Sequence, residues 1–112
     1  MAALAAALIT APGVSAQGKL PPYPDALRCA GLTSAANNIG KGTKESSQLF
    51  DHLIFWSMTA ADAGRAAGKN ARQVDADTSR EATAAEARLR AQDGGTSAAL
   101  ADCVRRVTPL DK

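Results

Sequence analysis

Two cysteines, Cys29 and Cys103, lie near opposite ends of a 112-residue chain and constrain its fold more than any other feature. The chain has little else to hold it together, because only 4% of its residues are aromatic and alanine supplies much of its 46% hydrophobic content. A domain of this size buries a modest fraction of its surface and often needs a crosslink. We therefore predict a disulfide between these cysteines; the alternative is two buried thiols in a reducing compartment.

The first 16 residues are uncharged and have the pattern of a secretory signal peptide. An apolar stretch over residues 2–10 is followed by a Pro-Gly break and then by the small residues of a cleavage site ending at Ala16. The basic residues that usually precede the apolar stretch of a signal peptide are missing. A membrane anchor is the alternative, but the stretch is far shorter than the roughly 20 apolar residues that a membrane span requires. We expect residues 1–16 to be a signal peptide and the protein to be exported, to the periplasm if bacterial and otherwise secreted.

The rest of the chain predicts a proline-rich extended lead-in over residues 17–23, in which Tyr23 is a packing residue, followed by a single helical domain over 24–112. Apolar residues recur at helical spacing, and no stretch alternates with the period of a strand. Helices are expected at about residues 24–39, 44–67, 71–92 and 97–107. Because the connections are short, the predicted fold class is all-α, a small antiparallel four-helix bundle.

Capping residues predict where these helices begin and end. Gly40 is expected to end the first helix in a left-handed conformation. The predicted N-caps are Thr43, Asn70 with Gln73 in a capping-box pattern, and Thr96 or Ser97. Within the second helix, Gly64 lies on the apolar side, where it is expected to allow close approach of a neighbouring helix.

The positions of the cysteines are consistent with this bundle. Cys29 lies about five residues after the start of the first predicted helix, and Cys103 about four residues before the end of the last. If those helices are antiparallel neighbours, the rise of 1.5 Å per residue brings the two cysteines to nearly the same level. Both also lie in apolar stripes, so their Cα atoms can come within the roughly 7 Å that a disulfide requires.

The second predicted helix carries seven of the larger apolar side chains between Leu49 and Met58. Its inner arc on a helical wheel is expected to comprise Leu49, Leu53, Trp56, Ala60, Gly64 and Ala67, with Phe50, Ile54 and Ala61 on one flank. Phe55 and Met58 fall on the opposite side. One interpretation is that this helix is central and covered on both sides. The other is that Phe55 and Met58 form an exposed patch for a partner protein or a second copy of the chain.

Few residues indicate chemistry. The net charge of +2, with acidic and basic residues interleaved, does not indicate a nucleic-acid partner, and no segment after residue 16 is apolar enough to span a bilayer. His52, the one histidine, lacks an orienting partner for base catalysis. With Cys29 and Cys103 it also lacks the close spacing of zinc ligands. We therefore predict no catalytic residue, metal or cofactor.

Two functions stay open on the sequence alone. The first is an exported, non-catalytic helical module that is protein-binding, chaperone-like or structural and acts through Phe55 and Met58. In cysteine count and helix content the chain resembles small acid-stress chaperones of bacterial periplasms, in which cysteines flank a helical segment. The second is a small-ligand carrier or enzyme whose pocket lies between the helices near Trp56 and His52.

Overall fold

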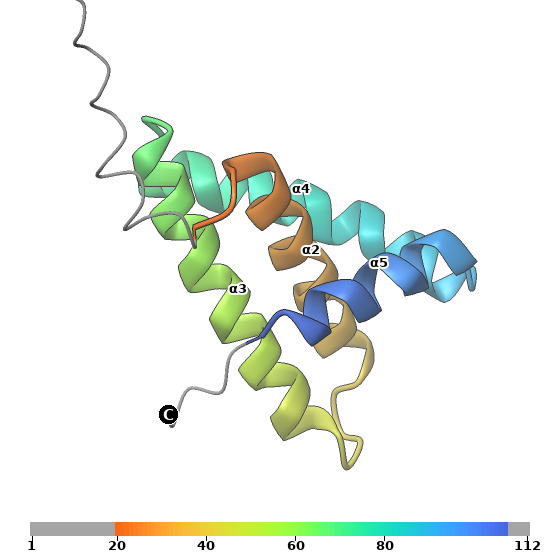
Figure 1. The fold of residues 1–112 in the computed structure, drawn as a ribbon. Coiled ribbons are helices and arrows are strands. Elements are labelled where there is room, and N and C mark those ends of the chain that lie inside the picture. Colours follow the sequence, from red (N-terminus) through yellow and green to blue (C-terminus); the bar gives the residue numbers. More distant parts are fainter. Residues whose placement is uncertain (1–19, 108–112) are drawn as a thin grey trace, which may run out of the picture.

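The structure is a computed structural model that describes residues 20–107, and this part of the chain is all-helical, as predicted (Figure 1). Its four helices are α2 (Tyr23–Ile39), α3 (Ser46–Ala66), α4 (Ala71–Arg90) and α5 (Gly94–Arg105). α2 packs extensively against both α3 and α4, and α5 crosses α2. The predicted helical bundle, with a disulfide between its first and last helices, is confirmed. The predicted signal peptide, residues 1–16, lies outside the described residues.

α2 is the central helix of this bundle and is buried on most of its sides. Its buried residues are Tyr23, Ala26, Cys29, Ala30, Gly31, Leu32, Thr33 and Ala35. Most of these side chains are small, which allows neighbouring helices to approach closely. At Gly31 an added Cβ would lie 2.5 Å from Glu81 Cβ and 2.9 Å from the Glu81 carbonyl carbon, so α4 packs directly on the backbone of α2. α2, rather than the helix that carries Phe55, therefore occupies the centre.

Three helices meet where the N-terminus of α2 lies between the end of α3 and the start of α4; we call this junction, formed by Tyr23, Gly64, Val74 and Asp77, the closed end. An added Cβ at Gly64 would lie 2.5 Å from Val74 Cγ2 and 3.3 Å from the Tyr23 ring, which confirms the predicted close approach. Tyr23 is buried, also as predicted, and its hydroxyl donates to Asp77 Oδ2 at 2.7 Å. Burial and this hydrogen bond raise the pKa of Tyr23 to about 12, and the same bond lowers the pKa of Asp77. Away from this junction α4 diverges from α3 (Figure 1).

The turn between α2 and α3 differs from the prediction at both capping positions. Gly40 has a φ of −89° and is not left-handed; Gly42, with a φ of +83°, takes that conformation instead. Thr43 does not cap α3, because its hydroxyl donates to Gly40 O at 2.7 Å within the turn and the helix begins at Ser46. The capping box at the start of α4 is confirmed, with Gln73 N donating to Asn70 Oδ1 at 2.8 Å and Asn70 N donating to Gln73 Oε1 at 2.9 Å.

α5 begins at Gly94, earlier than predicted, and its N-cap is Asp93 rather than Thr96 or Ser97. Asp93 Oδ2 accepts hydrogen bonds from the backbone N–H of Thr96 at 2.8 Å and from its hydroxyl at 2.6 Å, and these bonds lower the Asp93 pKa. The sequence misleads here because paired glycines usually interrupt a helix. In the structure Gln92, with a φ of +61°, takes the left-handed position after α4, and both glycines enter the first turn of α5.

The disulfide fixes α5 to the middle of α2. The Cα atoms of Cys29 and Cys103 are 5.5 Å apart, and both residues are fully buried. The two cysteines are 74 positions apart in the sequence. In the chain-entropy account, closing a loop of this length stabilises the folded state by about 4 kcal/mol. Because small domains have total stabilities of about 5–15 kcal/mol, this bond is a large part of what holds the thin core together.

Candidate functional site

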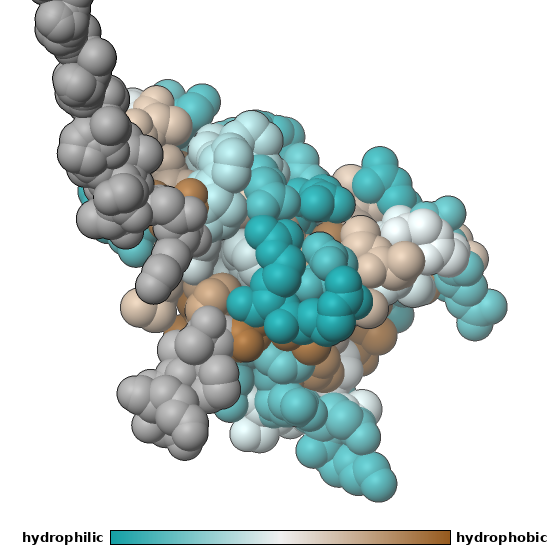
Figure 2. Space-filling model, in the orientation of Figure 1, coloured by the Kyte–Doolittle hydropathy of each residue, from teal (hydrophilic) through white to brown (hydrophobic). Residues whose placement is uncertain are grey.

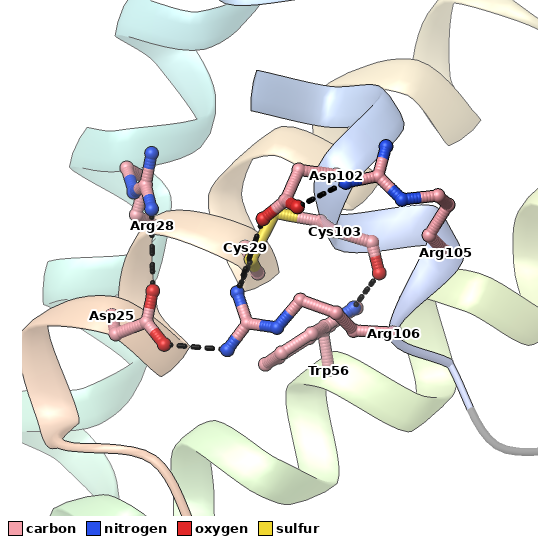
Figure 3. A network of polar contacts seen from close by, with 8 residues as sticks. All are labelled: Asp25, Arg28, Cys29, Trp56, Asp102, Cys103, Arg105 and Arg106. Atoms are coloured by element: carbon pink, nitrogen blue, oxygen red, sulfur yellow. Dashed lines mark hydrogen bonds and ion pairs between the residues drawn. A yellow bond between two sulfur atoms is a disulfide. The ribbon is translucent and has the colours of Figure 1, made fainter. Parts of the chain in front are cut away.

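A polar network around Arg106 joins the end of α5 to α2 and α3 (Figure 3). Arg106 Nη2 donates to Asp25 Oδ2 at 2.6 Å, and Arg106 Nη1 lies 3.5 Å from Asp102 Oδ2. The guanidinium also lies 5.0 Å from the ring centroid of Trp56, in cation–π range. The hydrogen bond between Arg106 and Asp25 lowers the pKa of the carboxyl and raises that of the guanidinium. These contacts surround the disulfide and fix three helices relative to one another.

The two residues predicted to line a pocket, Trp56 and His52, lie one turn apart on α3. Trp56 is only 2% exposed, and its indole N–H donates to Cys103 O at 2.9 Å. The Phe55 ring packs edge-on against it, with centroids 5.3 Å apart, so protein groups contact the indole from several directions. His52 is half-buried, and its Nδ1 has no hydrogen-bond partner among the described residues. Neither residue lines the hollows described below, and a pocket between them stays a prediction.

The predicted interaction patch, Phe55 and Met58, falls in two different environments. Phe55 is half-buried and packs against the core beside Trp56. Met58 is 60% exposed and lies on open surface. Phe55 is therefore less exposed than Met58, and a patch formed by the two together stays a prediction.

The exposed surface around Met58 instead extends to side chains that the helical wheel assigns to the flank of the core. Phe50 is 51% exposed, and Ile54 is half-buried. With Ala61 they fall within an arc of about 80° on a helix that turns 100° per residue; we call Phe50, Ile54, Met58 and Ala61 the α3 strip. The expectation that Phe50 flanks the core is wrong. α4, the helix on that side, contacts α3 at Gly64 and diverges from it toward the N-terminal end of α3, where Phe50 lies.

A hollow of about 690 Å³ lies between α3 and α4, next to the C-terminal part of the α3 strip. It is lined by Ser57, Ala61 and Arg65 on α3, by Lys69 and Asn70 in the connection, and by Ala71, Val74, Asp75, Thr78 and Ser79 on α4. Five of these ten side chains are small, and three others, Arg65, Lys69 and Asp75, are charged. α3 thus presents large apolar side chains near its N-terminus and a hollow with small side chains near its C-terminus.

A second hollow, of about 440 Å³, lies on the other flank of α3, between its first turns, the end of α2 and α5. It is lined by Ala36, Ile39, Gly40, Thr43, Glu45, Leu49, Leu89 and Leu100. Figure 2 shows hydrophobic surface gathered along this side of α5, toward the turn between α2 and α3. We call the part of α3 from its first turn to Met58, with Phe50 on one flank and this hollow on the other, the open end.

Within residues 20–107, no cluster of three or more His, Cys, Asp or Glu side chains is placed to hold a metal ion. No helix in the same range is long and apolar enough to cross a membrane. No protein family, curated protein or solved structure matches this chain.

The contacts of Arg106 and the exposure of Phe50 were not predicted from the sequence. For Arg106 the sequence offers only the i,i+4 spacing to Asp102, because an arginine at the end of a helix is common and its other partners, Asp25 and Trp56, lie on other helices. For Phe50 a signal existed in the seven large apolar side chains between Leu49 and Met58. One face of a helix cannot bury so many over so short a stretch, so either a second face is covered or some of them are exposed, and the sequence does not decide between these two.

Proposed function

We propose that this chain is an exported, non-catalytic helical module that binds another polypeptide through the apolar surface of α3. The observation that carries the proposal is the exposure of Phe50 and Met58, at 51% and 60%, within the densest apolar run of a chain that has few large apolar residues. Contiguous exposed apolar surface is costly in a monomer and typically marks a binding site. Aromatic residues and methionine are also enriched where proteins bind one another.

The rest of the structure supports a rigid platform for this surface. The disulfide, the Arg106–Asp25 contact and the Trp56 hydrogen bond fix α3 and α5 to α2, so the α3 strip is presented without a change in the fold. A preorganised surface loses less conformational entropy on binding than a flexible one. The strip itself consists of apolar side chains, of which Phe50 and Met58 are the most exposed, as a surface for another polypeptide requires.

Export is supported by the buried disulfide, because such bonds persist mainly outside the reducing cytosol. The charge-free apolar pattern of residues 1–16 supports it independently. Mass spectrometry of the protein recovered from its source cells is expected to show a chain that begins at Gln17. A recovered chain that still begins at Met1 would contradict this part of the proposal.

Binding is tested by light scattering of heat-unfolded citrate synthase, which exposes apolar segments, in the presence of the full chain. The wild-type protein is expected to delay aggregation, and the double variant Phe50→Ser/Met58→Ser to lose this effect. The matched control is Ala87→Ser/Ala98→Ser, which changes two exposed apolar residues on α4 and α5. The proposal fails if the wild type has no effect, or if the strip variant protects as well as the control.

A further inference from the structure

Cys103 is the residue through which α5 is fixed in the interior of the bundle. α5 has two buried residues, and the other one, Thr96, bonds within the cap of α5 itself. α2, α3 and α4 contact one another without α5, at Gly31 and Gly64. The disulfide to Cys29 therefore anchors a helix that lies outside the contacts among the other three. The remaining core contacts of α5 and the residues after it come from side chains that are only partly buried, Ala99, Leu100 and Val107.

The surroundings of the two sulfur atoms differ. Arg106 Nη1 lies 3.8 Å from Cys29 Sγ, and the described residues place no such donor against Cys103 Sγ (Figure 3). Both cysteines are fully buried, so burial opposes either thiolate alike. A carboxylate precedes each of them, Asp25 by one turn and Asp102 directly, so the acidic groups do not separate the two.

The helix dipole acts in the same direction as Arg106. Cys103 lies in the last turn of α5, where the dipole disfavours a negative charge, whereas Cys29 lies in the first half of α2. A negative charge is therefore more stable on Cys29 than on Cys103.

From this difference we infer that the disulfide is a redox-sensitive lock on α5, which a dithiol reductant opens at Cys103 with Cys29 as the leaving group. A thiolate of the dithiol attacks Cys103 Sγ and bonds to it, while the bond between the two cysteines breaks and its electron pair stays on Cys29 beside Arg106. The second thiol of the reductant, as a thiolate, then attacks the first, and Cys103 leaves with an electron pair and takes up a proton. The dithiol is oxidised to a disulfide, and the two cysteines are reduced.

The direction of this exchange follows from the leaving group. A thiolate of lower pKa leaves faster, and a neighbouring cation lowers the pKa of a thiol. In the reverse direction the Cys29 thiolate is the nucleophile that closes the lock again. The lock acts on α5 and not on the α3 strip, so it does not depend on what that strip binds.

Opening the lock changes the surroundings of Trp56, the single tryptophan of the chain. Its indole N–H donates to Cys103 O at 2.9 Å, and the Arg106 guanidinium lies 5.0 Å from its ring centroid. Both groups belong to the C-terminal end of α5, so the indole loses both when this helix separates. Trp56 then becomes accessible to water.

The first test follows Trp56 fluorescence and circular dichroism of the full chain during reduction by dithiothreitol. Reduction is expected to shift the emission to longer wavelength, while the helical signal falls by no more than the 12 residues of α5 contribute. The variant Cys29→Ala/Cys103→Ala is expected to show the shifted emission with or without dithiothreitol. Native emission after complete reduction overturns the lock. Loss of the whole helical signal also overturns it, because α5 would then not be released separately.

The second test identifies the sulfur that is attacked. Oxidised protein is mixed with glutathione and quenched in acid, and the mixed disulfides are located by peptide mass spectrometry. Glutathione is expected on Cys103 in about threefold or greater excess over Cys29. Equal labelling of the two cysteines, or a preference for Cys29, overturns the proposed direction.

Substitutions at Arg106 test the cause of this preference. Arg106→Leu is expected to lose most of it, whereas Arg106→Lys keeps a cation and is expected to retain it, with circular dichroism confirming that both variants fold. The matched control is Arg105→Leu, one residue earlier, which removes a guanidinium that bonds Asp102 and is expected to behave as wild type. An Arg106→Leu variant with the preference of Arg105→Leu, or an Arg106→Lys variant without it, overturns the role of Arg106.

Discussion

At the closed end, Tyr23, Gly64 and Val74 bring α2, α3 and α4 into contact, whereas at the open end Phe50 and Met58 project from α3 with no described helix packed over them. Both ends belong to the same two helices, α2 and α3. They differ in the size of the side chains. At the closed end Gly64 leaves space for the side chains of Tyr23 and Val74, whereas at the open end α3 carries more large side chains than the neighbouring helices cover.

The same difference distinguishes α2 from α3 as whole helices. α2 is buried on most sides, and most of its own buried residues are alanine, glycine, cysteine and threonine rather than large apolar residues. α3 carries most of the large ones, yet Trp56 is the only one of them among its buried residues. In this fold the central position therefore goes to the helix that its neighbours can approach most closely, since buried area depends on proximity as well as on hydrophobicity.

The largest effect is expected from Gly31→Val, which tests whether small residues in α2 allow its neighbours to pack closely. The new Cβ would contact the Glu81 backbone, which cannot move away as a flexible side chain does, so α4 must separate from α2. Overpacking of this kind should lower the free energy of unfolding by about 2–3 kcal/mol. Urea denaturation measures the change. Ala76→Val, exposed on α4, controls for valine in a helix and should cost well under half as much. Equal stabilities for the two variants would show that Gly31 does not set the α2–α4 spacing.

A smaller effect is expected at the closed end from Tyr23→Phe, which removes the hydrogen bond to Asp77 and should cost about 1 kcal/mol near neutral pH. The pKa of Tyr23 is raised from 10.0 to about 12, so folding favours the neutral phenol. Its contribution is therefore complete below about pH 10 and is lost as the pH rises through about 12.

The measurement is the difference in urea midpoint between wild type and Tyr23→Phe at several pH values, which cancels the titration of the other groups. This difference in urea midpoint should become smaller between pH 10 and pH 12. A difference that stays constant over this range would mean that the phenol is not held neutral by the closed end.

Much of this fold follows from the sequence because its determinants are local. The capping box of Asn70 and Gln73, the four helical segments and the level of the two cysteines depend on residues a few positions apart or on a simple rise per residue. The start of α5 was misplaced because the deciding residue, Asp93, lies before two glycines that resemble a break.

The candidate site was less predictable because it depends on which helix leaves which side uncovered. A helical wheel gives the direction of Phe50 but not the divergence of α4 that exposes it. Its apolar content favoured the helix that carries Phe55 as the central one. α2 is central instead, because its residues are small, and small residues add little to an apolar pattern in the sequence. Met58 was correctly placed on the side opposite the core arc, because that assignment needs the direction of the side chain alone.

The smallest expected effect is on stability at the open end. Phe50→Ser should change the free energy of unfolding of the monomer by no more than about 0.5 kcal/mol, as for other surface substitutions. Trp56→Ser, less than two turns along the same helix, should cost about 4 kcal/mol, because it empties a buried site and leaves Cys103 O and Arg106 without the indole. Both are measured by urea denaturation at low protein concentration, so that association does not add to the stability of the wild type. A large loss for Phe50→Ser under these conditions would mean that Phe50 stabilises the chain itself, and that the open end is part of the core rather than a surface for a partner.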